Sequence, residues 1–200
     1  YILKKFRKEI DAEFEKKGYI LAGLIDTGFF YIWTKNRVSS LADIRKQKMM
    51  TWFGTVETTT YAKLGIRPTP ISVPEVVTSL NTGLVDATTR PAPWILGTQA
   101  YHNLHYYVKQ PLFYSPAAII FSKKIQKHFR GKYSDILIHN FTELTVYETL
   151  AMEREWVEKY LRPYERKCFK AFETKAGIKP VTLSAKDMAV MEAAAKEVWE

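Results

Sequence analysis

An arginine at the end of an apolar segment is the residue of this chain best suited to hold an anion. Arg90 closes the run from Leu84 to Thr89, which the pattern predicts to be a strand, and Pro91 follows directly. Ligands in α/β folds bind where a strand ends and a helix begins. A guanidinium offers a planar fork of donors for a carboxylate or phosphate. We therefore expect Arg90 to line a ligand site, with a structural ion pair as the alternative.

Two tryptophans stand at comparable points of the chain. Trp52 lies near the end of a predicted strand over residues 48–53, and Trp94 begins a predicted helix over residues 94–101. Aromatic rings at strand ends can hold an apolar, planar or cationic ligand. Each ring could equally belong to the core, so both remain candidates for the ligand site.

The residue pattern gives little indication of a catalytic or metal-binding site. His102 and His105 could share a helical face, but zinc needs at least a third ligand. The single cysteine, Cys168, excludes an internal disulfide, and its setting favours a structural thiol. Asp26 and Asp86 are isolated carboxylates at predicted turns. We expect no catalytic residue, no metal and no cofactor.

The composition indicates a globular protein with a basic surface. The chain has 200 residues, of which 46% are hydrophobic, and its formal net charge is +9. Such a charge suits an anion-seeking surface or nucleic-acid binding. The basic residues are spread, however, and no nucleic-acid-binding motif accompanies them. A solvated basic face is therefore the expected role, with a nucleic-acid- or anion-binding domain as an alternative.

Hydrophobic periodicity predicts alternating strands and helices in the middle of the chain and helices at both ends. The alternation over residues 48–109 favours a βαβ domain with a mostly parallel sheet. One helix is expected to begin at Pro74, to present Val76, Val77, Leu80 and Leu84 on one face, and to end near Gly83. The other expected elements are helices 2–17, 40–45, 55–64, 123–129, 134–175 and 184–200, and strands 19–25, 29–34, 69–73, 106–109 and 117–122, with a turn at residues 26–28.

The run ISVPEVVTSLNTGLVDATTRP resembles a motif of the dicarboxylate-binding (DctP) type of TRAP-transporter solute-binding protein, "pvpxsEvyxaLqtGvvDgxenP". SSLADIRKQKMMTW, YAKLGIRPTPIS, HYYVKQPLFYSPAAIIFSKKIQKHF and the C-terminal AGIKPVTLSAKDMAVMEAAAKEVWE are similar to further segments of that family, in the same order. The resemblance therefore covers nearly the whole chain. In the first motif the matching residues are Pro70, Glu75, Leu80, Thr82, Gly83, Val85, Asp86 and Pro91.

The resemblance implies a periplasmic-binding-protein-like (type II) fold of two α/β lobes with long C-terminal helices. Residues 1–28 would form part of lobe I, residues 29–115 lobe II, and residues 116–200 would return to lobe I. Because the chain begins with Tyr1 and the match begins inside the family pattern, we expect an N-terminal part of lobe I, and a signal peptide in the precursor, to precede it.

The resemblance also implies a function. Such a protein captures a small organic ligand in the periplasm by hinge closure between its lobes and delivers it to TRAP-type permease subunits, without catalysis. It would be peripheral to the membrane through that partner alone. The alternative that the resemblance leaves open is an accessory periplasmic protein of a drug-efflux or resistance system.

Three positions depart from the family pattern. The arginine that grips the ligand carboxylate in the family falls on Met50, the asparagine of "enP" falls on Arg90, and a position that is often polar or basic falls on Phe30. A ligand other than a plain dicarboxylate is therefore expected. The residues expected to line its site are Arg90, Trp52, Trp94, Phe30, Met50, Thr51 and Glu75.

Overall fold

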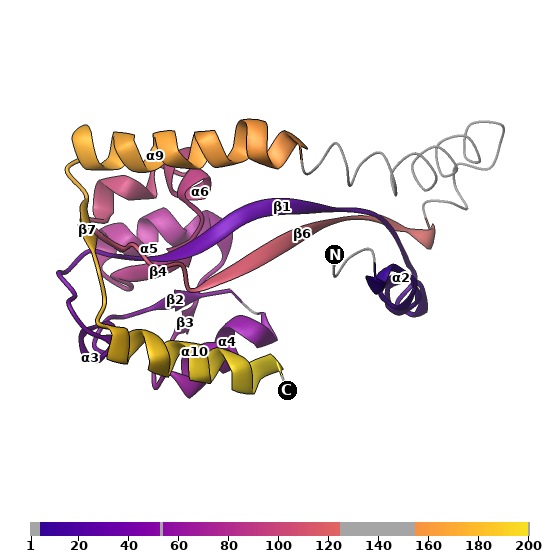
Figure 1. Ribbon diagram of the computed structural model, residues 1–200, viewed down its shortest axis with the longest axis horizontal. Helices are drawn as coiled ribbons and strands as arrows, with labels where there is room; N and C mark the ends of the chain where they lie inside the picture. Colours follow the sequence, from indigo (N-terminus) through magenta and orange to yellow (C-terminus); the bar gives the residue numbers. More distant parts are fainter. Residues whose placement is uncertain (1–4, 53, 125–154, 200) are drawn as a thin grey trace. The chain divides into compact units, whose positions relative to one another are not determined.

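The computed structural model describes residues 5–52, 54–124 and 155–199 (Figure 1). The chain divides into two compact units, one of Tyr1–Thr27 and Ser115–Arg162, the other of Gly28–Tyr114 and Pro163–Glu200. In this division residues 116–162 group with residues 1–27, and residues 163–200 group with residues 28–114; the expected lobe boundaries stay a prediction. Residues 125–129 of the expected helix 123–129 and residues 134–154 of the expected helix 134–175 lie outside the described residues.

The first unit contains helix α2 (Arg7–Lys16) and a π-helical turn, η3 (Val157–Leu161). Gly18, with φ +81°, follows the last turn of α2, as the sequence predicts. Arg7 joins the helix to the adjoining strand, since its Nε lies 2.8 Å from Oδ1 of Asp11 and its Nη2 donates to the carbonyl oxygen of Leu21 at 2.8 Å. Arg162 forms an ion pair with Asp26 at 2.7 Å.

One long strand, β1 (Tyr19–Thr34), replaces the two strands and the turn predicted for this region. It continues through Gly28, whose φ of +94° is available to glycine at little cost. Strand β6 (Phe113–Ser122) pairs with β1. Hydrogen bonds from Leu112 N–H to Phe30 O and from Lys123 N–H to Gly18 O show that the two strands run in opposite directions. This pairing keeps the segment extended where Asp-Thr-Gly alone suggests a turn.

The main sheet of the second unit is mixed rather than mostly parallel. Its order is β4 (Ala87–Arg90), β1, β5 (Tyr106–Val108) and β7 (Lys179–Val181). Strand β1 is antiparallel to both β4 and β5, and only β5 and β7 are parallel. Parallel pairing within the expected βαβ region is limited to β2 (Met50–Thr51) with β3 (Thr69–Pro70) and to the bridge between Met49 and Ala87.

Local capping signals place the short helices where the sequence predicts them. Ser40 caps α3 (Leu41–Arg45), its hydroxyl accepting from the N–H of Asp43 at 3.2 Å. Turn η1 (Val73–Glu75) leads into α5 (Val76–Thr82), which ends at Gly83 with φ +73°. Leu84, expected on the apolar face of this helix, is exposed. The remaining helices near the sheet are α4 (Thr55–Lys63), α6 (Ala92–Gly97) and η2 (Ala100–Asn103).

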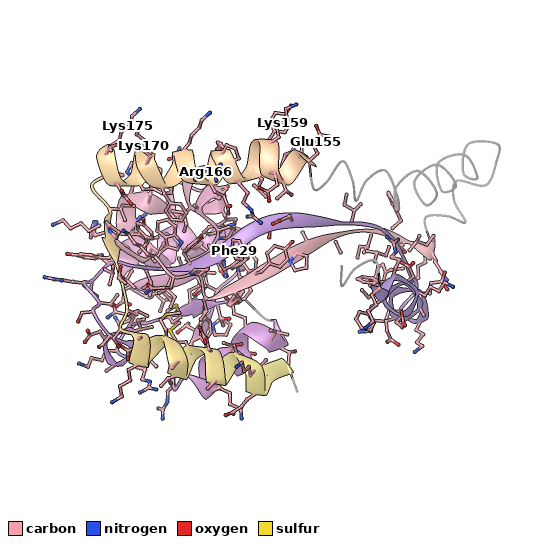
Figure 2. The ribbon with its side chains drawn as sticks, in the orientation of Figure 1. Phe29, Glu155, Lys159, Arg166, Lys170 and Lys175 are labelled. Carbon is pink, nitrogen blue, oxygen red and sulfur yellow. The ribbon has the colours of Figure 1, made fainter. Side chains whose placement is uncertain are left out.

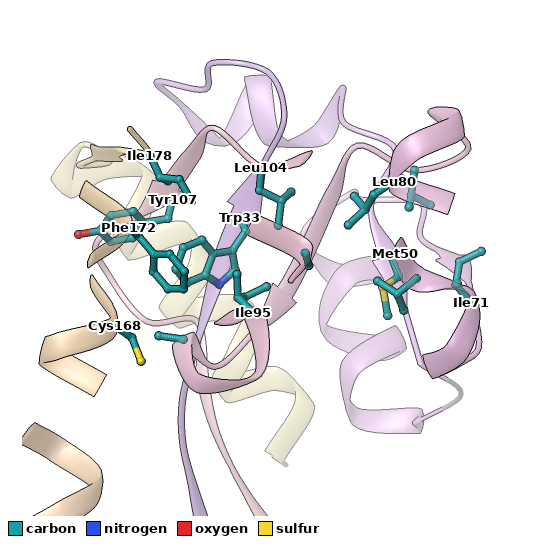
Figure 3. Packing of buried hydrophobic residues seen from close by; sticks show 14 residues of the cluster. Trp33, Met50, Ile71, Leu80, Ile95, Leu104, Tyr107, Cys168, Phe172 and Ile178 are labelled. Carbon is teal, nitrogen blue, oxygen red and sulfur yellow. The ribbon is translucent and has the colours of Figure 1, made fainter. Parts of the chain in front are cut away.

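Two apolar cores lie on opposite faces of the main sheet because neighbouring residues of a strand point to opposite sides. Trp33 and Tyr107 belong to the core that α5, α6 and α9 (Arg162–Thr174) complete, part of which Figure 3 shows. Ile32 and Val108 belong to the core completed by α3, α4 and α10 (Ala185–Trp199). The second unit therefore has a helix–sheet–helix arrangement.

Helix α9 is amphipathic, and most of its basic residues are exposed. Cys168 and Phe172 are buried against the sheet, whereas Arg166 and Lys170, and Lys175 just after the helix, are exposed (Figure 2). Within the described ranges, every helix is too short or too polar to cross a membrane.

Candidate functional site

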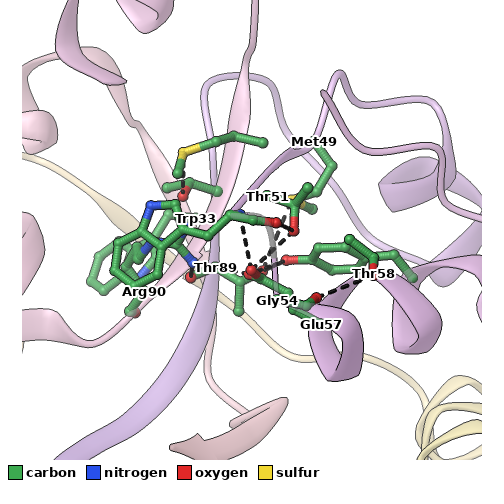
Figure 4. Close-up of polar contacts among 12 residues, drawn as sticks. Trp33, Met49, Thr51, Gly54, Glu57, Thr58, Thr89 and Arg90 are labelled. Atoms are coloured by element: carbon green, nitrogen blue, oxygen red, sulfur yellow. Dashed lines mark hydrogen bonds and ion pairs between the residues drawn. The ribbon is translucent and has the colours of Figure 1, made fainter. Parts of the chain in front are cut away.

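Arg90 is the last residue of β4, and its side chain is completely buried. Its backbone is anchored in the sheet, because it pairs with Tyr31 of β1 and its carbonyl oxygen accepts from Nε1 of Trp33 at 2.8 Å. The sequence predicts a side chain that leaves the sheet where loops gather. The guanidinium instead lies under neighbouring side chains (Figure 4).

Glu57 is the counterion of Arg90, and the sequence analysis did not identify it. Its Oε1 lies 2.9 Å from Nη1 of Arg90, which also donates to the carbonyl oxygen of Thr89. Glu57 lies in the first turn of α4, where a carboxylate is favoured by the helix dipole. An acidic residue is common at that position for this reason alone. The sequence around Glu57 therefore does not indicate that it pairs with Arg90.

The carboxylate of Glu57 is held from several directions. Its Oε2 accepts from the hydroxyl of Thr51 at 2.9 Å and from the backbone N–H of Trp52 at 3.0 Å. The hydroxyl of Tyr61 lies 3.3 Å from Oε1 and 2.6 Å from Oγ1 of Thr89. Burial raises the pKa of the Tyr61 phenol, and the charge of Glu57 adds to this rise, so the ring stays neutral. The carboxylate is therefore fixed in position.

Three donors of this cluster stay unpaired among the described residues. Nε and Nη2 of Arg90 and Nε1 of Trp52 are buried and have no hydrogen-bond partner among the residues that the structure describes. Buried donors are rarely left unpaired in proteins. The Nε–H and one N–H of Nη2 share one edge of the guanidinium, so they form a two-pronged fork. Glu57 uses the other nitrogen, and the fork remains available for a planar pair of acceptors.

Trp52 and Trp94, which the sequence predicts to line a ligand site together with Arg90, both lie beside its guanidinium. Cζ of Arg90 lies 3.6 Å from the ring centroid of Trp52 and 5.8 Å from that of Trp94. The two rings meet edge to face, with centroids 6.3 Å apart and an interplanar angle of 73°. Both pack against the core while remaining partly exposed. Their π faces stabilise the buried cation. Burial lowers the pKa of Arg90, and the charge of Glu57 opposes that shift.

Thr51 also belongs to this cluster, whereas the remaining predicted site residues, Met50, Phe30 and Glu75, lie elsewhere. Met50 is a fully buried core residue whose sulfur lies 3.4 Å from Oγ1 of Thr88. Phe30 is buried and stacks on Phe113 at 5.0 Å between centroids. Glu75 is exposed, and its carboxylate closes a capping box with Ser72 at the start of η1. Each of these three side chains thus has a structural role.

A hollow of about 510 Å³ lies between η2 and the end of α9, and its wall contains no residue of the Arg90 cluster. His102, His105 and Lys175 contribute to its wall, together with apolar residues such as Leu96 and Phe172. The two histidines do not gather a third metal ligand there. In the part of the chain that the structure describes, no three His, Cys, Asp or Glu residues are grouped closely enough to hold a metal ion.

Comparison with protein families and solved structures places this fold. Residues 2–200 match the family model of DctP, the bacterial extracellular solute-binding proteins of family 7. A TRAP periplasmic solute-binding protein of Bradyrhizobium, solved with galacturonate, is similar with 27% identity and a TM-score of 0.78. A Bordetella pertussis extracytoplasmic solute receptor that binds pyroglutamic acid has 18% identity and a TM-score of 0.80, and a Pseudomonas aeruginosa protein with bound L-malate has 16% identity and a TM-score of 0.79.

These matches confirm the expected α/β binding-protein fold class. The chain is covered almost completely, at 97%, 98% and 98% in the three cases. It spans 61% of the Bradyrhizobium chain, 62% of the Bordetella chain and 67% of the Pseudomonas chain. The architecture of the second unit, including β2, β4 and the helices that position Arg90, thus belongs to a known class of ligand-binding fold.

Proposed function

Because the chain belongs to family 7 of the bacterial extracellular solute-binding proteins, we propose that it is a receptor for a small organic acid. It captures the acid outside the cytoplasm, in the periplasm, and delivers it to the membrane subunits of a TRAP-type transporter. It binds and releases its ligand without changing it. The family consists of solute-binding proteins rather than enzymes.

The observation that carries this proposal is the free fork of Arg90. Its Nε and Nη2 and the Nε1 of Trp52 are buried donors that have no partner in the described part of the chain. A carboxylate would accept two parallel hydrogen bonds from the fork, and a further oxygen of the ligand could accept from the indole. Because these donors are screened from solvent, a ligand must shift a side chain that covers them. Trp52 is the candidate, since its ring lies directly over the Arg90 guanidinium and is partly exposed.

The position of the arginine supports a rearranged site. In the family pattern the carboxylate-binding arginine falls at Met50 on β2, whereas here the guanidinium comes from Arg90 on β4. The two strands are neighbours, because Met49 bridges Ala87 and the Met50 sulfur lies 3.4 Å from Oγ1 of Thr88. A guanidinium from β4 can therefore reach the same region, but it arrives with Glu57 attached and between two tryptophan rings.

Binding measurements on the complete protein test this function. The probes are D-galacturonate, pyroglutamate, orotate and L-malate, which are the acids bound by structurally similar proteins. We expect calorimetry to detect a stoichiometric complex with at least one of them. The diagnostic variant is Arg90→Lys, which keeps a cation for Glu57 and removes the fork.

We expect Arg90→Lys to weaken binding by about 2 kcal/mol or more, as for truncating one half of a buried charge pair. Arg67→Lys, at an exposed position, is the matched control and should bind like the wild type. The proposal fails if none of the acids binds, or if Arg90→Lys binds with unchanged affinity.

A further inference from the structure

We propose that Glu57 makes this site selective for ligands with a single carboxylate and disfavours dicarboxylates. The inference rests on the proposed function, because it assigns a ligand class to the Arg90 site. Glu57 would act as a specificity-determining residue: it contributes charge at the site, and it stays bonded to Arg90 when the ligand occupies the fork.

The first step is the charge balance of the cluster. Arg90 and Glu57 carry opposite unit charges 2.9 Å apart, so the pair is neutral before a ligand arrives. In the part of the chain that the structure describes, Arg90 is the one cation in contact with Glu57, Trp52 or Trp94. One carboxylate on the fork therefore gives the group formed by Arg90, Glu57 and the ligand a net charge of −1, and a second carboxylate gives that group −2.

The second step is that the carboxylate of Glu57 keeps its place beside Arg90 when a ligand binds. Its two oxygens accept hydrogen bonds from the Thr51 hydroxyl, the backbone N–H of Trp52 and Nη1 of Arg90. The hydroxyl of Tyr61 lies beside them. Turning the carboxylate away would leave several of these buried groups unpaired, which is costly. The negative charge is thus a permanent part of the site.

The third step compares the two kinds of ligand. A first carboxylate gains two charge-assisted hydrogen bonds from the fork, and these offset the repulsion from Glu57. A second carboxylate on the same small molecule meets the same negative charge, and no second guanidinium among the described residues has a buried, unpaired edge to offer it. At an effective dielectric constant of about 20, like charges roughly 8 Å apart repel by about 2 kcal/mol, or on the order of tenfold or more in affinity. The site should therefore reject the dianion.

The experiment compares each diacid with a monoacid of the same skeleton, on the complete protein. One pair is L-malate and its monoamide, and the other is galactarate and D-galactonate, which are both open-chain six-carbon acids. The variant is Glu57→Gln, which keeps the size of the side chain and removes its charge. Glu173→Gln is the control, because Glu173 accepts from the Tyr107 hydroxyl at 2.6 Å and does not contact Arg90.

We expect the wild type and Glu173→Gln to bind the monoacid of at least one pair on the order of tenfold or more tightly than the diacid. Glu57→Gln should reduce that ratio on the order of tenfold, by gaining affinity for the diacid. If the wild type binds acids but prefers the diacid, or if Glu57→Gln leaves the ratio unchanged, the inference is overturned and the proposed function stands. If neither the wild type nor Glu57→Gln binds any of the acids, the inference and the proposed function are both overturned. Should Glu57→Gln not fold, the wild-type ratios alone decide.

Discussion

The guanidinium of Arg90 meets the carboxylate of Glu57 through Nη1 alone, at 2.9 Å, although both residues are largely buried. A purely structural ion pair would be expected to use the two-pronged edge, which gives the strongest contact with a carboxylate. Here that edge has no partner in the described residues, and the neighbouring indole N–H of Trp52 has none either. The ion pair thus stabilises the cation and leaves the Nε–Nη2 edge of the guanidinium without a partner in the described residues.

Breaking the Arg90–Glu57 pair should destabilise the fold more than removing both charges. We expect Arg90→Met to lower the free energy of unfolding by about 3–5 kcal/mol, because it leaves Glu57 buried without its counterion. The double variant Arg90→Met with Glu57→Gln should recover part of that loss, by about 1–3 kcal/mol. Urea unfolding of the wild type, both single variants and the double variant measures the coupling. Strictly additive losses would contradict a direct interaction.

Trp52→Phe should separate stability from binding. The variant keeps an aromatic ring over the guanidinium and deletes an N–H that has no partner among the described residues. We expect the free energy of unfolding to change by less than about 1.5 kcal/mol, while the affinity for the acid falls by about 1 kcal/mol, the usual net value of one hydrogen bond. Thermal unfolding and calorimetry measure the two effects. A variant that binds as tightly as the wild type would show that the indole N–H does not contact the ligand.

Gly28→Ala should be strongly destabilising. Gly28 has φ +94°, and a Cβ at this position would overlap Oε1 of Glu165 on α9. The positive φ of a non-glycine residue, together with the shift forced on the Glu165 carboxylate, should cost about 1–3 kcal/mol. Gly97→Ala is the matched control, because a Cβ there meets no atom within 4 Å and its φ is not positive. Equal stability of the two variants, measured by urea unfolding, would contradict the close approach of Glu165 to β1.

Asp43 should make the stability pH-dependent at low pH. Its carboxylate accepts from the Ser39 hydroxyl at 2.8 Å, the Ser39 N–H at 3.0 Å and the Ser40 hydroxyl at 3.0 Å. These hydrogen bonds, that of the Ser39 hydroxyl first, lower the pKa of Asp43 from 3.8 to about 2. The stabilisation is therefore complete above pH 3.8 and is lost as the pH falls through about 2.

The test for Asp43 compares melting temperatures of the wild type and Asp43→Asn at pH 6 and near the lowered pKa. We expect the wild type to be the more stable protein at pH 6 and the difference to shrink in acid. Ser39→Ala should give an intermediate result, because it removes the hydroxyl donor and keeps the backbone donor. A difference that does not change with pH would show that Asp43 acts through its shape rather than its charge.

The local elements could be predicted because their signals are local. Ser40 caps α3, Gly83 ends α5, and Arg90 ends β4, each where the residue types require it. The turn expected at Asp26–Gly28 was wrong because a left-handed glycine fits both a turn and a strand, and pairing with β6 decides between them. The mostly parallel sheet was wrong because β1, which sets the directions of β4 and β5, precedes the βαβ pattern.

The candidate site was predicted only in part for a similar reason. The neighbourhood of Arg90, Trp52 and Trp94 follows from strand ends that can be located in the sequence. Glu57 is 33 residues from Arg90 and sits among threonines at the start of α4, where an acidic residue is ordinary. Its partnership with Arg90 depends on how α4 packs beside β4, which residue types alone do not specify.

The sheet order also limits when the second unit can be completed during synthesis. Strand β1 pairs with β4 and β5, which are made after it, and β5 pairs with β7 (Lys179–Val181), which is made later still. One core needs Met191 and Ala194, and Lys63 of α4 pairs with Glu197 of α10 at 2.8 Å. The core around Ile32 therefore stays incomplete on the ribosome until residues 191–197 have been made. A nascent chain of this kind exposes apolar surface to aggregation and to chaperones until that segment has emerged.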